Sequence, residues 1–378
     1  MKKILILGAG EMQIPIIEKC NSLGYETIVT DYSKEAPGLK LAKVPLIIDT
    51  LNKDKTLQVA QEYKIDGILT TSDAPVRTVA FVCNKLGLSG ISEKAASIGT
   101  NKYLQRELLR SSGLNSPQFI KSNNFDYLER EVAEFSFPLI VKPVDSSASR
   151  GVSKIMDIDS LKTAFLEAKE FSKSGDIIIE EFISGREYSI EGITQNGETV
   201  IVAITEKTVI KNSNFFVEER HIVPAELNSK QESAIKDYVK QVIKLFGINN
   251  SATHTEIMLT KQGPVLIELG VRLGGDFITS YLVPLATGVD MQKNIIFLAL
   301  NKKIEVSGRE QKFTGVQFVH DANFELAQEK ITVENYFVKA ELKSFKKTPV
   351  KNSLDRLGYF IFREETRAKL LEKLDFKN

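Results

Sequence analysis

The sequence predicts an α/β domain followed by an α+β region, and three observations support this. Apolar runs alternate with helix-like segments over residues 1–95, the pattern of a parallel sheet with helices on both faces. From about residue 116, strand-like runs separated by short loops replace that alternation. The chain has 378 residues, of which 42% are hydrophobic, and this is enough for about two or three domains.

The first elements follow one another closely. Each early apolar run is short and leads into an amphipathic segment, and two of these segments end at a glycine, Gly24 or Gly87. We therefore expect strands at 2–10, 25–31 and 65–73, helices at 11–24, 53–64 and 75–87, and a further helix over 100–113.

Strand-like runs dominate the rest of the chain. We expect paired strands within 137–155 and 176–194, a helix over 159–173 between them, and longer helices at 229–247 and 290–303. These changes divide the chain into an α/β domain (1–95), a linker helix (96–115), a small α+β subdomain (116–186), a larger antiparallel subdomain (187–321) and a C-terminal α+β segment (322–378).

Composition argues against several classes of function. The chain has 50 basic and 49 acidic residues, so no charge excess favours nucleic acid or an anionic membrane as a partner. No apolar run reaches the roughly 20 residues of a membrane-spanning helix. The two cysteines, Cys20 and Cys83, argue against a disulfide framework and favour a cytoplasmic protein. Because the chain has three histidines and two cysteines, we do not expect a dedicated zinc site.

Residues 253–272 raise the main functional question, because each of two apolar strands contains a glutamate. The strands, "THTEIML" and "PVLIELGVR", are separated by a turn at "KQG". A three-residue turn with glycine last predicts that Leu259 faces Val265, Met258 faces Leu266 and Glu256 faces Glu268. One face then carries Thr255, Ile257, Leu259, Val265, Ile267, Leu269 and Val271, and the other carries His254, Glu256, Met258, Leu266, Glu268, Gly270 and Arg272.

Glu256 and Glu268 predict a magnesium site. Like charges that face each other on a sheet are destabilising, so a divalent cation, a raised pKa or a nearby base must offset that repulsion, and magnesium fits best. Magnesium takes oxygen ligands and keeps water and substrate phosphates in its shell. Arg272, on the same face, suits a phosphate oxygen. The alternative is a solvated hairpin face that carries two glutamates by chance.

Two further segments suit a nucleotide. Lys142 ends an apolar strand directly before the mostly small residues 145–151, whose backbone N–H groups suit phosphates as glycine-rich loops do. An ordinary hairpin loop explains the same pattern. Residues 180–182 leave one strand and Glu187 enters the next, which suits adenine and ribose hydroxyls or a plain charged strand edge.

The N-terminal "GAGEMQ" is a partial dinucleotide fingerprint, with Asp31 at the end of the second strand. Gln13 replaces the third glycine, so the close helix–strand packing of that motif is not specified. The incomplete fingerprint argues against an NAD-dependent oxidoreductase.

Three pairs of residues are candidates for substrate binding. Ser72 and Asp73 follow a parallel strand, where ligands of such sheets gather, although Asp73 equally suits a helix cap. Gly274 and Gly275 precede a predicted helix whose N-terminus suits a carboxylate, with a turn capped by Asp276 as the alternative. The third pair, Arg220 and His221, lies beside a strand and faces either a substrate or solvent.

Taken in order, these segments resemble an ATP-grasp enzyme over essentially the whole chain. The resemblance rests on the α/β domain followed by "NKYLQRELLRSSGLNSPQF", "FPLIVKPVDSSASRG", "IIEEFISGREYSIEG" and "THTEI…VLIELGVRLGG". "RLGGD" and the late "LDRLGYFIF" are similar to the carbamoyl-phosphate-synthase-like and L-amino-acid-ligase branch. The resemblance implies a Rossmann-like pre-ATP-grasp domain, then an ATP-grasp fold with a small lid subdomain and a larger antiparallel-sheet subdomain.

The resemblance also implies roles for individual residues. Catalysis falls to Arg272 and Lys142, metal binding to Glu256 and Glu268, and the loop 145–151 is the lid over the phosphates. ATP binding falls to Lys102, Lys142, Ser146, Ser147, Ser149, Gly151, Glu180, Glu181, Phe182, Ile183 and Glu187. The cofactors are ATP and Mg²⁺ or Mn²⁺, with two ions expected. Gly270 stands where the family often has an asparagine metal ligand, so water or substrate would complete that shell.

The implied reaction joins a small carboxylate to a small amine. ATP phosphorylates the carboxylate, the amine attacks the acylphosphate, and ADP and phosphate leave, giving an amide or peptide bond on an amino acid. A homodimer is one expected assembly, because dimers are the commonest. The alternatives are a carboxylating or carbamoylating enzyme that uses bicarbonate, and an ATP-binding regulator without turnover, which would have little need of both glutamates.

Overall fold

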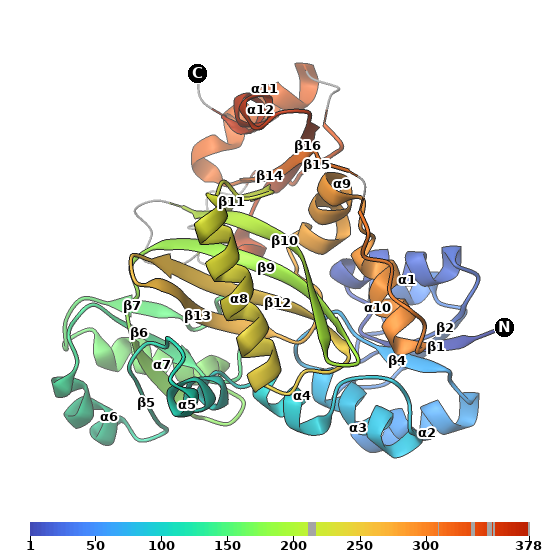
Figure 1. The fold of residues 1–378 in the computed structure, drawn as a ribbon, viewed down its shortest axis with the longest axis horizontal. Coiled ribbons are helices and arrows are strands. Elements are labelled where there is room, and N and C mark those ends of the chain that lie inside the picture. Colours follow the sequence, from blue (N-terminus) through green and yellow to red (C-terminus); the bar gives the residue numbers. More distant parts are fainter. Residues whose placement is uncertain (211–216, 309, 334–336, 346–349, 351, 377–378) are drawn as a thin grey trace.

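Three β-sheets organise the chain in the computed structural model (Figure 1). A four-stranded sheet of the N-terminal unit and a four-stranded sheet of a small unit flank a central sheet of eight strands. The structure describes residues 1–210, 217–308, 310–333, 337–345, 350 and 352–376. The predicted combination of an α/β domain with α+β units is confirmed.

The N-terminal sheet is parallel, with strand order β3-β2-β1-β4. Side chains of β1 alternate between two cores: Leu5 and Leu7 pack with α2 and α3, and Ile4 and Ile6 pack with α1 and α10. The prediction lacked β3 and α4. The bounds are β1 (Lys3–Leu7), η1 (Glu11–Gln13), α1 (Ile14–Ser22), β2 (Glu26–Asp31), η2 (Pro37–Leu41), β3 (Val44–Ile47), α2 (Lys53–Tyr63), β4 (Gly67–Leu69), α3 (Val76–Leu86) and α4 (Glu93–Gly99).

Helix α10 (Met291–Ala299) comes from far along the chain and completes the N-terminal unit. It lies beside α1 and β4 (Figure 1). A Cβ atom on Gly67 of β4 would lie 2.5 Å from the carbonyl oxygen of Ala299, so glycine permits this close packing. The N-terminal and central units therefore share one hydrophobic core, which includes Ile6 and Ile295 as well as Val316 of the central sheet.

Helix α5 (Lys102–Ser112) connects the N-terminal unit to the small unit. It begins at Asn101, whose side chain accepts a hydrogen bond from the backbone N–H of Leu104, and it ends at Gly113 with a φ of 74°. The small sheet has the order β5-β8-β6-β7 and packs against α6 and α7 through a core that includes Leu128 and Phe165. The bounds are β5 (Phe119–Ser122), α6 (Phe125–Glu131), η3 (Val132–Glu134), β6 (Leu139–Pro143), β7 (Ser153–Ile155), α7 (Leu161–Phe171) and β8 (Ile177–Glu181).

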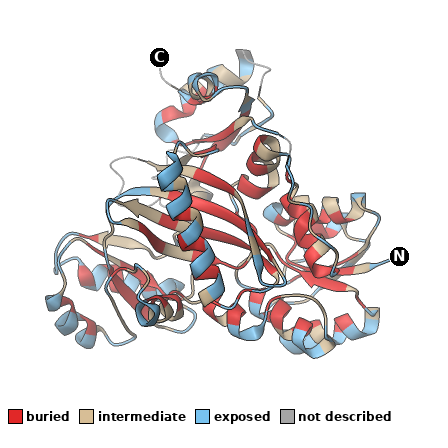
Figure 2. Cartoon of the chain, viewed as in Figure 1, coloured by how far each residue is buried: buried red, intermediate tan, exposed pale blue. Residues whose placement is uncertain are grey.

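The central sheet is antiparallel, with strand order β13-β12-β9-β10-β11-β14-β16-β15. Helix α8 (Ser229–Leu245), which begins with a capping box between Asn228 and Gln231, covers one face of the sheet through Ile235 and Val239. Figure 2 shows the middle of this sheet as buried. The strands are β9 (Arg186–Gln195), β10 (Glu198–Val209), β11 (Glu218–Val223), β12 (Ser251–Thr260), β13 (Gly263–Gly270), β14 (Phe313–Val319), β15 (Lys339–Leu342) and β16 (Gly358–Glu364).

The C-terminal segment is joined to the central sheet. Strands β15 and β16 continue the sheet beyond β14, so the sheet crosses the boundary drawn at residue 321. The remaining helices are a π-helix η4 (Ile278–Leu282), α9 (Val283–Thr287), η5 (Asp321–Asn323), α11 (Phe324–Val333), η6 (Ser353–Asp355) and α12 (Arg367–Leu374).

Candidate active site

A row of ionisable side chains crosses the central sheet on the face opposite α8. On β9, Tyr188 and Ile190 pack with α8, so the alternating residues Glu187 and Glu191 face the other way. The register brings Glu191 opposite His254 of β12. On the neighbouring strand β10, Lys207 lies opposite His221 of β11. Of the predicted residues of this sheet, Glu187, His221 and Glu256 therefore lie on one face, whereas Arg220 does not.

Glu256 and Glu268 face each other across β12 and β13, as predicted. The turn and the register that lead to this pairing differ from the predicted ones. Thr260 pairs with Gly263, so the turn has two residues rather than three, and the Thr260 hydroxyl accepts from the Gln262 N–H and donates to the Gly263 carbonyl. A β-bulge then leaves Ile267 unpaired and restores the predicted register beyond it.

The predicted pairs nearer the turn are consequently wrong. Met258 faces Val265, Leu259 faces Pro264 and Leu266 faces Ile257. Leu266 is fully buried in the core with Ile257, although alternation without a bulge had assigned it to the face of the glutamates.

Each of the facing glutamates is paired with a lysine. The Nζ atom of Lys102, on α5, lies 2.9 Å from Glu268 Oε1. The Nζ atom of Lys207 lies 2.6 Å from both Glu256 Oε1 and Glu187 Oε1, and 3.4 Å from Glu218 Oε1. The two lysines supply the positive charge that keeps the carboxylates together on one face.

The charges around Lys207 shift its neighbours in opposite directions. Burial alone would raise the pKa of Glu256, but Lys207 and His254 outweigh it and hold that pKa well below its usual range. Burial raises the pKa of Glu187 and the nearby Glu256 and Glu218 carboxylates add to this, while Lys207 opposes it. Burial would lower the pKa of Lys207 itself, but its three carboxylate neighbours raise it well above the usual value.

A second buried cluster joins α5 to the small unit. Lys142 Nζ lies 2.7 Å from Glu180 Oε2, and Arg106 Nε lies 2.9 Å from Glu180 Oε1. Burial would raise the pKa of Glu180, but Arg106 and Lys142 lower it. For Lys142, burial lowers the pKa and the Arg106 charge contributes in the same direction. The predicted phosphate-binding lysines, Lys102 and Lys142, are thus each paired with a carboxylate, Glu268 and Glu180 respectively.

Arg272 forms a bidentate ion pair with Asp73 of the N-terminal unit. Its Nε and one terminal nitrogen each lie 2.9 Å from a different Asp73 oxygen. Burial would raise the pKa of Asp73, but Arg272 lowers it, and Asp73 in turn raises the pKa of Arg272 against the effect of burial. Asp73 makes no side-chain cap for α3, whose N-cap is Pro75, so of its two predicted roles the structure favours contact with the site.

His254 lies between Glu191 and Glu256 and contacts both carboxylates. Its Nδ1 lies 2.6 Å from Glu191 Oε1, and its Nε2 lies 3.4 Å from Glu256 Oε1. Burial would lower the pKa of His254, but Glu191 and Glu256 outweigh it and raise the pKa to about 9. Gly274 lies directly over this pair, since a Cβ atom there would be 2.7 Å from His254 Nδ1.

His221 and Asp276 extend the site toward the C-terminal segment. Arg356, which follows η6, places one terminal nitrogen 2.9 Å from Asp276 Oδ2 and the other 2.6 Å from Glu218 Oε2. His221 Nε2 lies 3.7 Å from the same Asp276 oxygen. Burial would raise the pKa of Asp276, but Arg356 and His221 lower it. The "LDRLGYFIF" segment thereby contributes an arginine to the site.

The loop between β6 and β7 carries the predicted phosphate-binding residues. The Ser146 carbonyl accepts a hydrogen bond of 2.5 Å from Lys102 Nζ, and the Ser147 carbonyl accepts one from Arg150 Nε at 3.1 Å. Ser149 and Gly151 have positive φ values of 55° and 70°, like Ala148. Loops with such left-handed residues turn backbone N–H groups toward one point, as phosphate-binding nests do.

The predicted adenine-binding residues lie where the small and central sheets meet, between β8 and β9. Phe182 and Ile183 are half-buried, and Lys154 Nζ lies 3.8 Å from the centre of the Phe182 ring. Glu181 is exposed, in contrast to the buried Glu180. Glu180 is therefore the carboxylate that this strand directs into the network.

Two expectations are not met. Arg220 points toward the C-terminal helix instead of the site: it donates to Gln317 Oε1 and to the Leu374 carbonyl. Alternation along β11 places Arg220 and His221 on opposite faces, and a bulge at Glu219, where the register shifts between Thr208 and Val209 of β10, brings Glu218 to the side of His221. The second expectation was a helix that starts directly after Gly274 and Gly275, but Asp276 and Phe277 have positive φ values and the helix begins at Ile278 as a π turn.

Sequence reasoning missed Arg106, Glu191, Lys207 and Arg356. Two of them had a usable signal. Arg106 lies four residues after Lys102 and so shares its helix face. Lys207 is a lysine near the end of the strand "ETVIVAITEKTV", where a buried charge needs partners. The positions of Glu191 and Arg356 depend on tertiary packing, which no local pattern encodes.

The donor set fits magnesium better than a softer metal. Its groups are carboxylate oxygens on a rigid hairpin, and Mg²⁺ uses one or two protein carboxylates together with water and substrate phosphates. Across the described ranges, no three histidine, cysteine or acidic side chains are grouped as a complete metal cage.

Among the described helices, none is both long and apolar enough to span a membrane.

Comparison with known proteins finds a family match in the middle of the chain. Residues 135–280 match a family model described as the ATP-grasp domain. Alanine–anticapsin ligase of Bacillus subtilis (strain 168) is 30% identical over 246 residues, which are 59% of this chain and 51% of that protein. The chain thus spans about half the length of the curated relatives it matches.

Solved structures resemble the chain over nearly its whole length. The L-amino acid ligase from Bacillus licheniformis superposes with a TM-score of 0.84 at 23% identity, covering 99% of this chain and 96% of that one. The biotin carboxylase domain of the Hydrogenobacter thermophilus 2-oxoglutarate carboxylase, solved with MgADP and bicarbonate, gives a TM-score of 0.77 at 17% identity, covering 99% and 88% of the two chains. At these identities the likeness shows the fold.

Proposed function

Residues 135–280 match the ATP-grasp domain, and on that premise we propose that the chain is an ATP-dependent carboxylate–amine ligase that forms an amide or peptide bond on an amino acid. The observation that carries the proposal is the pair of facing glutamates, each with its own lysine, on the hairpin of β12 and β13. A binder without turnover would have no need of two carboxylates held against each other.

The proposed reaction has two steps. The carboxylate substrate attacks the γ-phosphoryl group of ATP, which gives an acylphosphate and ADP. The amine then attacks the acyl carbon, and phosphate leaves. Such chemistry requires the protein mainly to position the reactants and to stabilise negative charge as it moves.

Cationic side chains of the site would provide that stabilisation. Lys102 and Lys142 would hold phosphate oxygens, and Arg272, oriented by its bidentate contact with Asp73, would face the transferring phosphoryl group. The loop 145–151 would close over the phosphates and exclude the water that hydrolyses acylphosphates. Phe182, Ile183 and Glu187 would hold adenine and ribose.

Magnesium would be held by Glu256 and Glu268, with ATP oxygens and water completing its shell in place of a ligand at position 270. The ion would polarise the phosphoryl oxygens. Lys207 would keep Glu187, Glu218 and Glu256 near one another beside that ion.

Phosphate and ADP release from MgATP tests the proposal, with pooled amino acids, other small acids and bicarbonate as substrates. We expect release that requires one carboxylate and that falls more than about 100-fold in Glu268→Gln, because even outer-shell changes at metal sites cost about 10–100-fold. The matched control is Glu129→Gln, an exposed residue of α6. Release that persists unchanged in Glu268→Gln would contradict the proposal, and release with bicarbonate alone would select the carboxylating alternative.

A further inference from the structure

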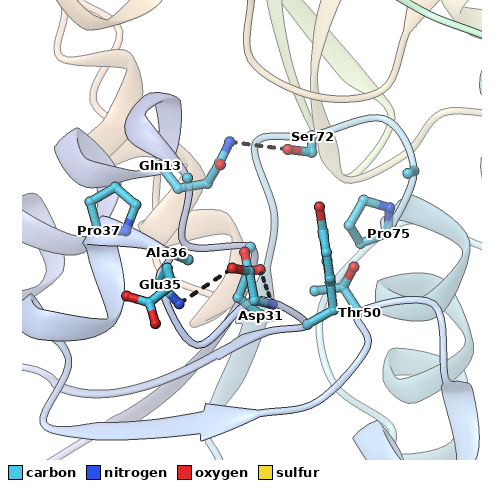
Figure 3. Close-up of a pocket in the computed structure, with 13 residues that line it drawn as sticks. Gln13, Asp31, Glu35, Ala36, Pro37, Thr50, Ser72 and Pro75 are labelled. Atoms are coloured by element: carbon cyan, nitrogen blue, oxygen red, sulfur yellow. Dashed lines mark hydrogen bonds between the residues drawn. The ribbon is translucent and has the colours of Figure 1, made fainter.

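A cavity of about 460 Å³ lies in the N-terminal unit, outside the ATP site described above (Figure 3). Its lining comes from the loops after the parallel strands: Gly10 follows β1, Asp31 ends β2 and Ser72 follows β4. Ligands of open α/β sheets bind outside the carboxyl ends of the strands, and the volume is within the range of small-molecule pockets.

The cavity adjoins the phosphoryl-transfer centre through two consecutive residues. Ser72 lines the cavity, and the next residue, Asp73, holds Arg272 at 2.9 Å. Ser72 is itself fixed by Gln13, whose amide nitrogen donates to the Ser72 hydroxyl at 3.0 Å, as Figure 3 shows. The cavity therefore borders the segment that holds Arg272.

The lining is acidic and neutral. It includes Asp31 and Glu35, and no lysine or arginine is among the described residues that line it. Both Asp31 oxygens already accept backbone hydrogen bonds, from Ala9 at 2.8 Å and from Ser33 at 2.9 Å. The remaining polar groups are hydroxyls and one amide, on Tyr32, Ser33, Thr50, Ser72 and Gln13. Such a lining disfavours a ligand that carries a phosphate or carboxylate. It suits a small molecule that carries an ammonium group together with hydroxyl or amide groups.

Charges of both signs lie toward the C-terminal segment. Asp276, beyond Gly274, is held by Arg356, which also contacts Glu218, and buried His221 lies beside it. The cavity of the N-terminal unit differs from that region, because its described lining residues include no lysine or arginine.

We propose that this cavity binds the amine substrate, a small amine that carries hydroxyl or amide groups and no phosphate; this rests on the ligase function proposed above. The amine nitrogen, once deprotonated, attacks the acyl carbon, a C–N bond forms, and the C–O bond to phosphate breaks with its electron pair on the phosphate. Of the two protons lost from the ammonium group, one goes to the departing phosphate and the other to water.

The test separates the two half-reactions. Hydroxylamine is small and traps an acylphosphate as a hydroxamate, so hydroxamate formation reports carboxylate activation, while full ligation with an added amine reports amine binding. The cavity is narrowed by Thr50→Phe, because Thr50 lines it (Figure 3). Its matched control is Thr163→Phe, an exposed threonine on α7. Ethanolamine is compared with O-phosphoethanolamine, and glycinamide with glycine.

We expect Thr50→Phe to raise the KM for the amine by about tenfold or more, the usual scale for a filled pocket, with hydroxamate formation and its carboxylate KM unchanged. Glu35→Lys should raise the KM for ethanolamine and glycinamide and lower it for their anionic counterparts. Equal amine KM values in Thr50→Phe and wild type would overturn the amine site, as would a change confined to the carboxylate. No hydroxamate from wild-type protein with any acid would instead overturn the ligase assignment, and the amine site with it.

Discussion

Lys207 and His254 set the charge balance around Glu256. Lys207 contacts Glu256, Glu187 and Glu218, and His254 adds a cation from the neighbouring position on β12. The facing glutamates could be predicted from the sequence, because each stands alone in an apolar strand. The pairing of Glu256 with Lys207 could not, since Lys207 comes from β10, and neither could the contact of His254 with Glu191, since Glu191 comes from β9.

The protonation of His254 predicts a pH dependence of stability. Its pKa rises from 6.5 to about 9 on folding, so its contribution is fully present below pH 6.5 and is lost as the pH rises through 9. The free energy of unfolding should therefore fall between these values. Urea unfolding of wild type and His254→Gln across this range measures it. A fall of the same slope in both proteins would contradict the assignment.

The hairpin of β12 and β13 shows why element boundaries matter for the site. A two-residue turn and a bulge at Ile267 have opposite effects on the register, so Glu256 and Glu268 face each other while the pairs nearer the turn are shifted. The Thr260 hydroxyl that closes the turn was a local signal. The bulge depends on the packing of Leu266 against Ile257 and the rest of the core, which sequence alternation does not reveal.

The two glycines before η4 predict unequal effects of substitution. A Cβ atom on Gly274 would lie 2.7 Å from His254 Nδ1 and 2.8 Å from Glu191 Oε2, whereas a Cβ atom on Gly275 would meet nothing within 4 Å. We expect Gly274→Ala to lower the free energy of unfolding by about 1–3 kcal/mol and to reduce activity through Glu256. Gly275→Ala is its matched control, with a change within about 0.5 kcal/mol. Denaturant melts measure both, and equal losses would show that the His254–Glu191 pair is not tightly packed.

At the scale of the molecule, contacts between units assemble the site. The Arg272–Asp73 pair joins the central sheet to the N-terminal unit, the Lys102–Glu268 pair joins it to α5, and α10 fixes the N-terminal unit from a distant part of the chain. The order of units could be predicted from alternating patterns and from the resemblance. The packing of α10 against the N-terminal unit and the position of Arg356 in the site could not be predicted, because both depend on contacts between residues far apart in sequence.

The central claim is that a carboxylate is activated by direct phosphorylation, and transfer of an oxygen label tests it most directly. A carboxylate substrate labelled with ¹⁸O is incubated with MgATP and the amine, and the phosphate released is analysed by mass spectrometry. An acylphosphate route predicts one labelled oxygen in each phosphate, because the oxygen that attacked ATP leaves with the phosphoryl group. Unlabelled phosphate accompanying product formation would contradict the account.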